Sequence, residues 1–179
     1  LSKSNFYCQF NKLCMKVNVR PFRGSDNLDV ATIEGEDWSS KQYWREMASG
    51  EQYSDIPDIG RKKIFLIAEL DEEIVGYLLA FKVDSEKHPF PSDEEFQRQE
   101  IRESLYIDGL EVGNTAQYQR TAGELLEEVM QKAVEYDSIL VRTNTRAKKA
   151  MGVYLRHGFQ GLEVDDSGHP ERTYLVREL

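Results

Sequence analysis

The chain is short of cysteine, of histidine and of long apolar runs. Its two cysteines, Cys8 and Cys14, both lie near the start, whereas a disulfide framework uses several cysteines spread through the fold. The three histidines, His88, His157 and His169, lack the spacing of metal ligands, so we interpret them as surface or loop residues and expect no metal site. No apolar run approaches the roughly 20 residues that cross a bilayer. We therefore expect a cytoplasmic protein with no membrane partner.

Positive charge is also in short supply. The chain has 23 basic and 32 acidic residues, which gives a formal net charge of -9. The resulting field repels phosphate backbones, so we expect no nucleic-acid partner and a preference for cationic small molecules or peptides. A phosphate-bearing ligand remains compatible with this charge, because backbone amides at a helix start can hold phosphate locally.

The length and composition are those of one compact domain. A chain of 179 residues, 40% hydrophobic and 31% charged, has room for a single sizeable core. The first residues contain no basic start followed by a continuous apolar stretch, so they do not resemble a signal peptide. We expect an N-terminal extension over residues 1–14 and one domain over residues 15–179.

Strand and helix patterns alternate along this domain. Alternating or β-rich apolar residues predict strands at 17–19, 64–70, 74–83, 105–112, 138–143 and 174–176. Helical spacing predicts helices at 26–38, 40–47, 122–135 and 146–156. A polar turn at Asp71 predicts a hairpin, and the charged segment 84–103 is expected to be a loop. The interleaved order favours a mixed sheet in an α/β or α+β layout.

The most informative segment is the strand, short loop and helix at 105–133. Such a junction places free backbone N–H groups and the positive end of a helix dipole at one point, which suits a pyrophosphate. Many strand-to-helix turns bind nothing, so this junction alone leaves a purely structural role open.

Three motifs together, by their order and spacing along the chain, resemble those of the GNAT family of N-acetyltransferases. Gln117-Tyr-Gln-Arg-Thr-Ala, five residues after Val112, resembles the acetyl-CoA motif Gln/Arg-x-x-Gly-x-Gly/Ala of that family. Ala150-Met-Gly-Val-Tyr-Leu-Arg-His-Gly-Phe resembles its Ala-x-x-x-Tyr-x-x-x-Gly-Phe segment, and the hairpin with Gly76-Tyr77 resembles its central strand pair. The resemblance covers residues 15–179. It implies a central mixed, mostly antiparallel sheet flanked by helices and splayed between the fourth and fifth strands.

The resemblance also implies an activity. It implies an acyltransferase that moves an acetyl group from acetyl-CoA, as co-substrate, to a primary amine by direct attack. The amine could belong to a peptide or protein N-terminus, to a lysine or to a small molecule, and a homodimer is left open. Two departures motivate an alternative, a regulatory domain that binds acyl-CoA without turnover. Arg120 replaces the usual first glycine, and Ala147 replaces the usual asparagine.

By resemblance, the acid that protonates the leaving thiolate is Tyr154, and the backbone N–H near Val112 stabilises the oxyanion. The candidates for the base that receives the amine proton are Tyr106 and Glu111, which are about equally favoured, and Asp108, which is less favoured. Strand alternation puts Tyr106 and Asp108 on one face and Glu111 on the other, unless a bulge re-aims the strand.

Acetyl-CoA contacts are implied for one stretch of strand, loop and helix and for one residue near the next helix. Arg120 could add its guanidinium to the pyrophosphate or obstruct it, and Asn144 could contact the cofactor or cap the helix. The implied contact residues are Leu110, Val112, Gln117, Tyr118, Gln119, Arg120, Thr121, Ala122, Gly123 and Asn144.

Overall fold

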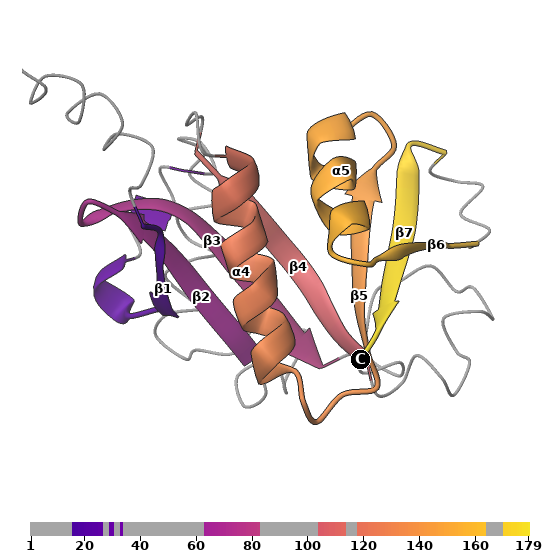
Figure 1. Ribbon diagram of the computed structural model, residues 1–179, viewed down its shortest axis with the longest axis horizontal. Coiled ribbons are helices and arrows are strands. Elements are labelled where there is room, and N and C mark those ends of the chain that lie inside the picture. The colour runs from indigo at the N-terminus through magenta and orange to yellow at the C-terminus, as the bar shows by residue number, and fades with distance from the viewer. Residues whose placement is uncertain are drawn as a thin grey trace, which may run out of the picture.

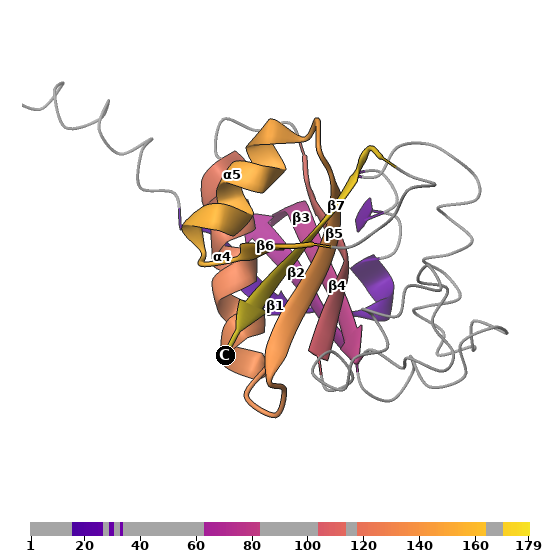
Figure 2. The ribbon, with the colours of Figure 1, turned by 90° about the vertical axis from the view of Figure 1, so that its right-hand side faces the viewer.

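The computed structural model describes residues 16–26, 29–30, 33, 63–82, 104–113, 118–163 and 170–179. These residues form a seven-stranded sheet in the order β1-β2-β3-β4-β5-β7-β6, with two α-helices on one of its sides (Figures 1 and 2). The strands are β1 Asn18–Pro21, β2 Lys63–Leu70, β3 Glu73–Lys82, β4 Ser104–Val112, β5 Ser138–Asn144, β6 Gln160–Leu162 and β7 Arg172–Glu178. The helices are α4 Tyr118–Lys132 and α5 Lys148–Arg156, and a short 3₁₀ turn, η2, covers Gly24–Asp26. The expected extension 1–14, helix 40–47 and loop 84–103 lie outside the described residues.

The predicted hairpin between β2 and β3 is confirmed. The strands pair antiparallel from Lys63↔Phe81 to Leu70↔Glu73. Asp71 and Glu72 make the turn with φ angles of 53° and 70°. Positive φ at both central residues is the geometry of a two-residue turn that matches the strand twist, and aspartate tolerates it better than most residues.

Two apolar layers cover the two faces of the sheet. The face under α4 and α5, here called the helix face, carries the larger cluster, which includes Leu78, Ile107 and Val141. α4 buries Leu125, Leu126 and Val129 in this cluster, and Ala133 follows directly after the helix, each with 0% exposure, which confirms the helical spacing predicted at 122–135. The other face, here called the outer face, carries aromatic clusters. Their members include Phe65, Tyr77, Phe81, Tyr106 and Tyr174.

β4 and β5 form the one parallel pair among the described strands, and they pair over half of their length. The register runs from Ser104↔Ser138 to Ile107↔Val141 and then stops. Beyond that point β4 continues beside β3 and β5 continues beside β7. The two strands therefore diverge, as Figure 1 shows, and the expected splay is confirmed. The end at which the two strands pair is here called the closed end. There the buried hydroxyls of Ser104 and Ser138 form a hydrogen bond with an oxygen–oxygen distance of 2.6 Å.

The short strand β6 is absent from the sequence-based expectation. It follows α5, which ends where Gly158 adopts a φ of 82°, and the guanidinium of Arg177 donates to the carbonyl oxygen of His157. β6 has three residues, includes Gly161 and pairs only with β7 within the described chain. A segment this short offers no alternation for a pattern to detect.

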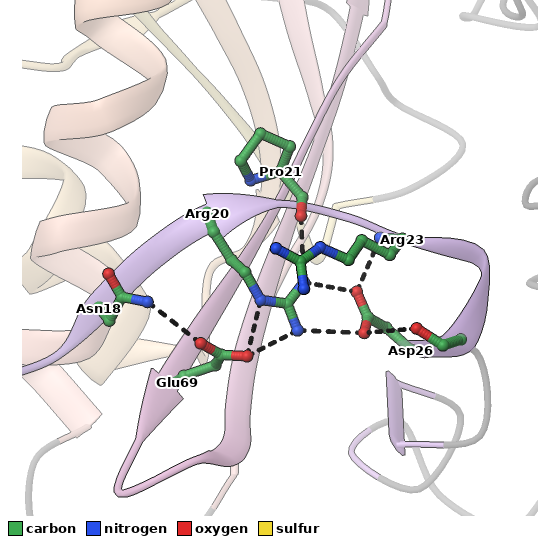
Figure 3. Close-up of polar contacts among 7 residues, drawn as sticks. Asn18, Arg20, Pro21, Arg23, Asp26 and Glu69 are labelled. Atoms are coloured by element: carbon green, nitrogen blue, oxygen red, sulfur yellow. Dashed lines mark hydrogen bonds and ion pairs between the residues drawn. The ribbon is translucent and has the colours of Figure 1, made fainter.

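A polar network on the outer face ties η2 to the sheet (Figure 3). The Arg20 guanidinium donates to Asp26 at 2.7 and 3.0 Å, and its Nε donates to Glu69 Oε1 at 2.6 Å. The backbone N–H of Arg23 also donates to Asp26 at 2.7 Å. Hydrogen bonding from Arg20 lowers the pKa of Glu69. Burial opposes ionisation of Asp26, but hydrogen bonds from Arg20 and Arg23 outweigh it and lower the pKa of that carboxyl.

Candidate active site

The upper part of β4 has one strand neighbour rather than two. The N–H of Gly113 donates to the carbonyl oxygen of Val75 in β3 at 2.8 Å. Alternate residues of a strand direct their backbone groups to opposite neighbours. The N–H and C=O groups of Val112 and Leu110 therefore point toward β5, which has already diverged. The structure thus presents a strand edge to the region between the diverging strands β4 and β5, here called the opening. The edge lies at the two β4 residues for which the resemblance implies contacts with acetyl-CoA.

Both helices begin at the open end of this strand pair. β4 and β5 are parallel, and each is followed along the chain by its own helix, α4 and α5. The first turns of both helices therefore bring unpaired N–H groups and positive dipole ends to the same edge of the sheet. Ala147, the N-cap of α5, supplies no side-chain hydrogen bond to that turn. The opening is therefore suited to an anionic group.

Three exposed basic side chains at the start of α5 were missed by the sequence analysis. Arg146, Lys148 and Lys149 lie at or just before the first turn. Basic residues are normally disfavoured there, because the helix dipole is positive at that end. The run Arg146-Ala-Lys-Lys directly before the Ala150 motif was the pattern that could have indicated a phosphate contact.

The acetyl-CoA motif occupies the first turns of α4. Gln117 lies outside the described residues, and Tyr118 and Gln119 are described as helix backbone only. Arg120 is exposed, and its Nε lies 3.8 Å from Glu124 Oε1 along the helix. Thr121 is fully buried, and its hydroxyl has no hydrogen-bond partner among the described residues. A buried hydroxyl in that state calls for a ligand, a water or a neighbouring backbone group.

Ala122 and Gly123 face the interior rather than the opening. Ala122 is 1% exposed in the helix-face cluster. A Cβ on Gly123 would lie 3.2 Å from His157 Nε2, so the missing side chain lets the end of α5 approach α4. His157 is partly buried there and its Nδ1 lies 2.7 Å from the carbonyl oxygen of Val153. It is thus a packed residue of the turn after α5 rather than a plain surface histidine.

Asn144 has a local hydrogen bond at the open end. Its Oδ1 accepts from the N–H of Arg146 at 2.8 Å. This bond shapes the turn between β5 and α5, and it explains why α5 begins at Lys148 rather than at the expected Arg146. Its contact with the cofactor stays a prediction.

Tyr154 lies on the buried side of α5. It is 4% exposed and belongs to the same cluster as Val112 of β4 and Val141 of β5. Its ring packs edge-on against Phe159 at a centroid distance of 5.3 Å. The phenol is therefore held in the helix-face layer between α5 and the two diverging strands, and its acid role stays a prediction.

A bulge in β4 changes which candidate bases share a face. The β3 register jumps from Leu79↔Gly109 to Ala80↔Ile107 and thus skips Asp108. Tyr106 is aligned with Phe81 and Glu111 with Tyr77. Residues four apart on β3 share a face, so Tyr106 and Glu111 both lie on the outer face. From the sequence, strict alternation separates these two residues unless a bulge re-aims the strand, and the structure contains that bulge.

Gly109 beside the bulge is covered by an aromatic ring. A Cβ at this position would lie 3.0 Å from Cε2 of Tyr77, which is fully buried. A larger residue would displace that ring, because an interior packed at native density has little free space.

The Tyr106 phenol is too deeply buried to ionise readily. The residue is 2% exposed and its ring meets Phe81 at 5.5 Å. Burial raises its pKa, Asp108 and Tyr174 raise it further, and Arg142 and Arg172 partly oppose the rise. The hydroxyl is therefore protonated at neutral pH, when it can donate a hydrogen bond.

Neither a membrane helix nor a metal cluster is found in the described ranges. No helix there is long and apolar enough to cross a membrane. No group of three or more His, Cys, Asp or Glu side chains there could hold a metal ion.

Comparison with known proteins supports the same architecture. An acetyltransferase of the GNAT family from Desulfovibrio desulfuricans has 16% identity and a TM-score of 0.65, with 91% of this chain and 99% of that chain covered. Ribosomal-protein-alanine N-acetyltransferase from Brucella melitensis has 14% identity and a TM-score of 0.62, with 90% and 99% covered. PaiA N-acetyltransferase from Thermoplasma acidophilum, solved with coenzyme A, has 10% identity and a TM-score of 0.61, with 92% and 100% covered.

These structures share the fold at low sequence identity, and a search of curated protein sequences found no match. A sequence profile described as "Acetyltransferase (GNAT) family" matches residues 28–159, which is more than half of the chain. That match and the sheet that opens between β4 and β5 lead to one conclusion: this chain belongs to the GNAT family of acetyltransferases, which take their acetyl group from acetyl-CoA.

Proposed function

We propose that this protein transfers the acetyl group of acetyl-CoA to a primary amine of a small molecule, peptide or protein. The observation that carries the proposal is the strand edge at Leu110 and Val112, directed into the opening where α4 and α5 both begin. A strand edge and two helix starts offer backbone donors to an elongated ligand that ends in phosphates.

The residues around the opening fit acetyl-CoA. Leu110 and Val112 would bond the chain between thioester and phosphates through their backbone groups. The first turn of α4 would hold the pyrophosphate, and the basic residues before and within the first turn of α5 would add charge. When bound, acetyl-CoA supplies an acetyl group activated as a thioester.

Glu111 is proposed as the base. It is exposed on the outer face, whereas Tyr106 on the same face is buried and stays protonated. An amine is mostly protonated at neutral pH, so a carboxylate must accept its proton, directly or through water, before the nitrogen attacks. Tyr106 then serves as a hydrogen-bond donor that positions the acceptor.

Val112 and Tyr154 are proposed to handle the developing negative charges. The N–H of Val112 points into the opening and would donate to the carbonyl oxygen of the acetyl group. The Tyr154 phenol, on the α5 side, would give its proton to the leaving sulfur. The amine proton thus leaves through Glu111, and the sulfur receives one from Tyr154.

The test combines calorimetric titration with acetyl-CoA and a free-thiol assay of CoA release over a panel of amines. We expect binding heat, and CoA release that depends on the amine. Binding without release for any amine would favour the regulatory alternative, and the absence of heat would overturn acetyl-CoA binding itself.

A variant pair locates the cofactor. Replacing Lys148 and Lys149 together by alanine should raise KM for acetyl-CoA and leave kcat nearly unchanged, because these side chains would contact groups remote from the reacting atoms. Lys132→Ala together with Lys16→Ala removes the same charge from exposed positions elsewhere and serves as the control.

A further inference from the structure

The outer face carries opposite charges on the two sides of the opening. On the β4 side, Asp108 and Glu111 are exposed. On the other side, Arg142 of β5 is exposed and Arg172 of β7 is partly exposed. Asp108 and Glu111 are here called the acidic rim, and Arg142 and Arg172 are called the basic rim. The rims are separated where β4 and β5 stop pairing, since Ile107↔Val141 is their last pair.

The register places both arginines on the outer face beside Tyr106. Arg142 is aligned with Tyr174, whose ring belongs to the same cluster as Tyr106. Arg172 is two residues before Tyr174 on the same strand and therefore on the same face. Arg142 and Arg172 are thus diagonal neighbours, about 7–8 Å apart at the backbone and close enough for two long side chains to meet one anion.

Electrostatics supports this placement. Both arginines act on the Tyr106 phenol, and both oppose the rise in its pKa that burial causes. The Arg142 side chain makes no hydrogen bond or ion pair with another residue in the described part of the chain. A carboxylate that binds the Arg142 guanidinium gains charge-assisted hydrogen bonds, and the charge of Arg172 beside it adds to the attraction.

We propose that the acetyl acceptor is a small zwitterionic amine, such as a free amino acid, whose carboxylate binds Arg142 with Arg172 alongside. Its amine then faces the acidic rim, where Glu111 accepts the proton. This inference rests on the proposed function and narrows it, because a polyamine or an internal lysine carries no carboxylate at the required place. The basic rim is opposite in sign to the protein's net charge of -9.

The experiment compares carboxylates with their carboxamides in the CoA-release assay. The probes are the common L-amino acids and the series glycine, β-alanine, γ-aminobutyrate and δ-aminopentanoate, each beside its amide. The series varies the separation of amine and carboxylate, so the best member reports the distance between the rims. For the preferred acceptor we expect kcat/KM about 10- to 100-fold above that of the amide, which is the range of a charged hydrogen bond.

Arg142→Ala should remove that preference, because the KM for the carboxylate acceptor should rise about 10- to 100-fold. The kcat/KM values for the amides and the KM for acetyl-CoA should stay unchanged. Arg142→Lys should restore part of it, because a lysine keeps the charge but loses the bidentate geometry. Arg156→Ala, which removes an equal charge at the exposed end of α5, should change neither constant.

Three outcomes would overturn the inference. If amides, other amines or peptides react as fast as the carboxylate acceptors or faster, the protein does not recognise the acceptor carboxylate. A preference that survives in Arg142→Ala would assign recognition elsewhere. A rise in the KM of acetyl-CoA in that variant would assign Arg142 to the cofactor. Each of these leaves acetyl transfer intact, whereas no CoA release with any amine would remove the proposed function together with the inference.

Discussion

The two ends of the β4–β5 pair differ in composition although they belong to the same two strands. At the closed end, Ser104 and Ser138 share a buried hydrogen bond, and every paired position through Ile107 and Val141 is buried. At the open end, Glu111, Arg142 and Asn144 are exposed. The closed end satisfies its polar groups internally, while the open end directs backbone and charged groups outward.

This difference assigns stability and chemistry to separate parts of one strand pair. Variants at the open end should change turnover and leave the free energy of unfolding nearly unaltered. Variants at the closed end, or in the remote Arg20 network, should do the reverse. Four substitutions test this separation.

The largest effect is expected for Tyr154→Phe. If the phenol protonates the leaving sulfur, the variant should lower kcat about 1000-fold while acetyl-CoA binds with nearly the same affinity, because the hydroxyl acts only as the bond breaks. Steady-state CoA release and calorimetry measure the two quantities. Tyr136→Phe, at a buried tyrosine after α4, is the matched control. An unchanged kcat in Tyr154→Phe would remove the residue from the mechanism.

Glu111→Gln should lower kcat/KM about 100-fold, less than the Tyr154 change because water can replace an exposed base in part. The rate should also lose the rise with pH that ionisation of this carboxylate produces. Tyr106→Phe should keep that rise, since burial raises the pKa of its phenol and the group stays protonated. A pH profile that flattens in Tyr106→Phe instead would reverse the two roles. Glu73→Gln, at the exposed start of β3, is the control.

Arg20→Ala should destabilise the fold by about 2 kcal/mol and leave kcat unchanged, because the buried Asp26 carboxylate loses its ion pair and keeps only the Arg23 N–H and a long 3.5 Å contact from Ser25 Oγ. The folded-state pKa values of Asp26 and Glu69 are lowered below 3.8 and 4.5. Their contribution is therefore present above those values and lost as the pH falls through the lowered ones.

Urea unfolding at several pH values measures this contribution. The wild-type advantage over Arg20→Ala should shrink as the medium becomes acidic. Arg23→Ala keeps the backbone hydrogen bond to Asp26 and should be nearly neutral. A pH-independent difference between wild type and Arg20→Ala would argue that the network stabilises through packing alone.

The smallest effect is expected for Ser104→Ala. It leaves the buried Ser138 hydroxyl without its 2.6 Å partner and should cost about 1 kcal/mol without altering kcat. The double change to alanine at both positions should cost less than the sum of the two single changes, since neither hydroxyl is then stranded. A fall in kcat would mean that closed-end packing also sets the geometry of the opening.

Much of the fold could be predicted from local patterns. The β2–β3 hairpin, the helix α4 and the positions along the chain of every described strand except β6 follow from periodicity and turn signals, which depend on neighbours in sequence. The splay came from the motif resemblance, and the structure confirms it through the register of β4 and β5.

The remaining features depend on contacts between distant segments. The bulge at Asp108 arises in the β3 register, beside the Tyr77 ring that covers Gly109, and β4 alone does not encode it. Strand β6 exists only as a partner of β7. The basic rim needs Arg142 and Arg172, thirty residues apart in sequence, to be brought together by the β5–β7 pairing. The shared face of Tyr106 and Glu111 has the same origin.

The measurement that tests the central claim most directly is amide hydrogen exchange with and without acetyl-CoA. The account predicts that acetyl-CoA slows exchange at the N–H of Val112, which points into the opening. The N–H of Gly113, already bonded to Val75 at 2.8 Å, should change little. Unchanged exchange at Val112 when acetyl-CoA saturates the protein, or protection confined to residues away from β4, would contradict a cofactor bound between β4 and β5.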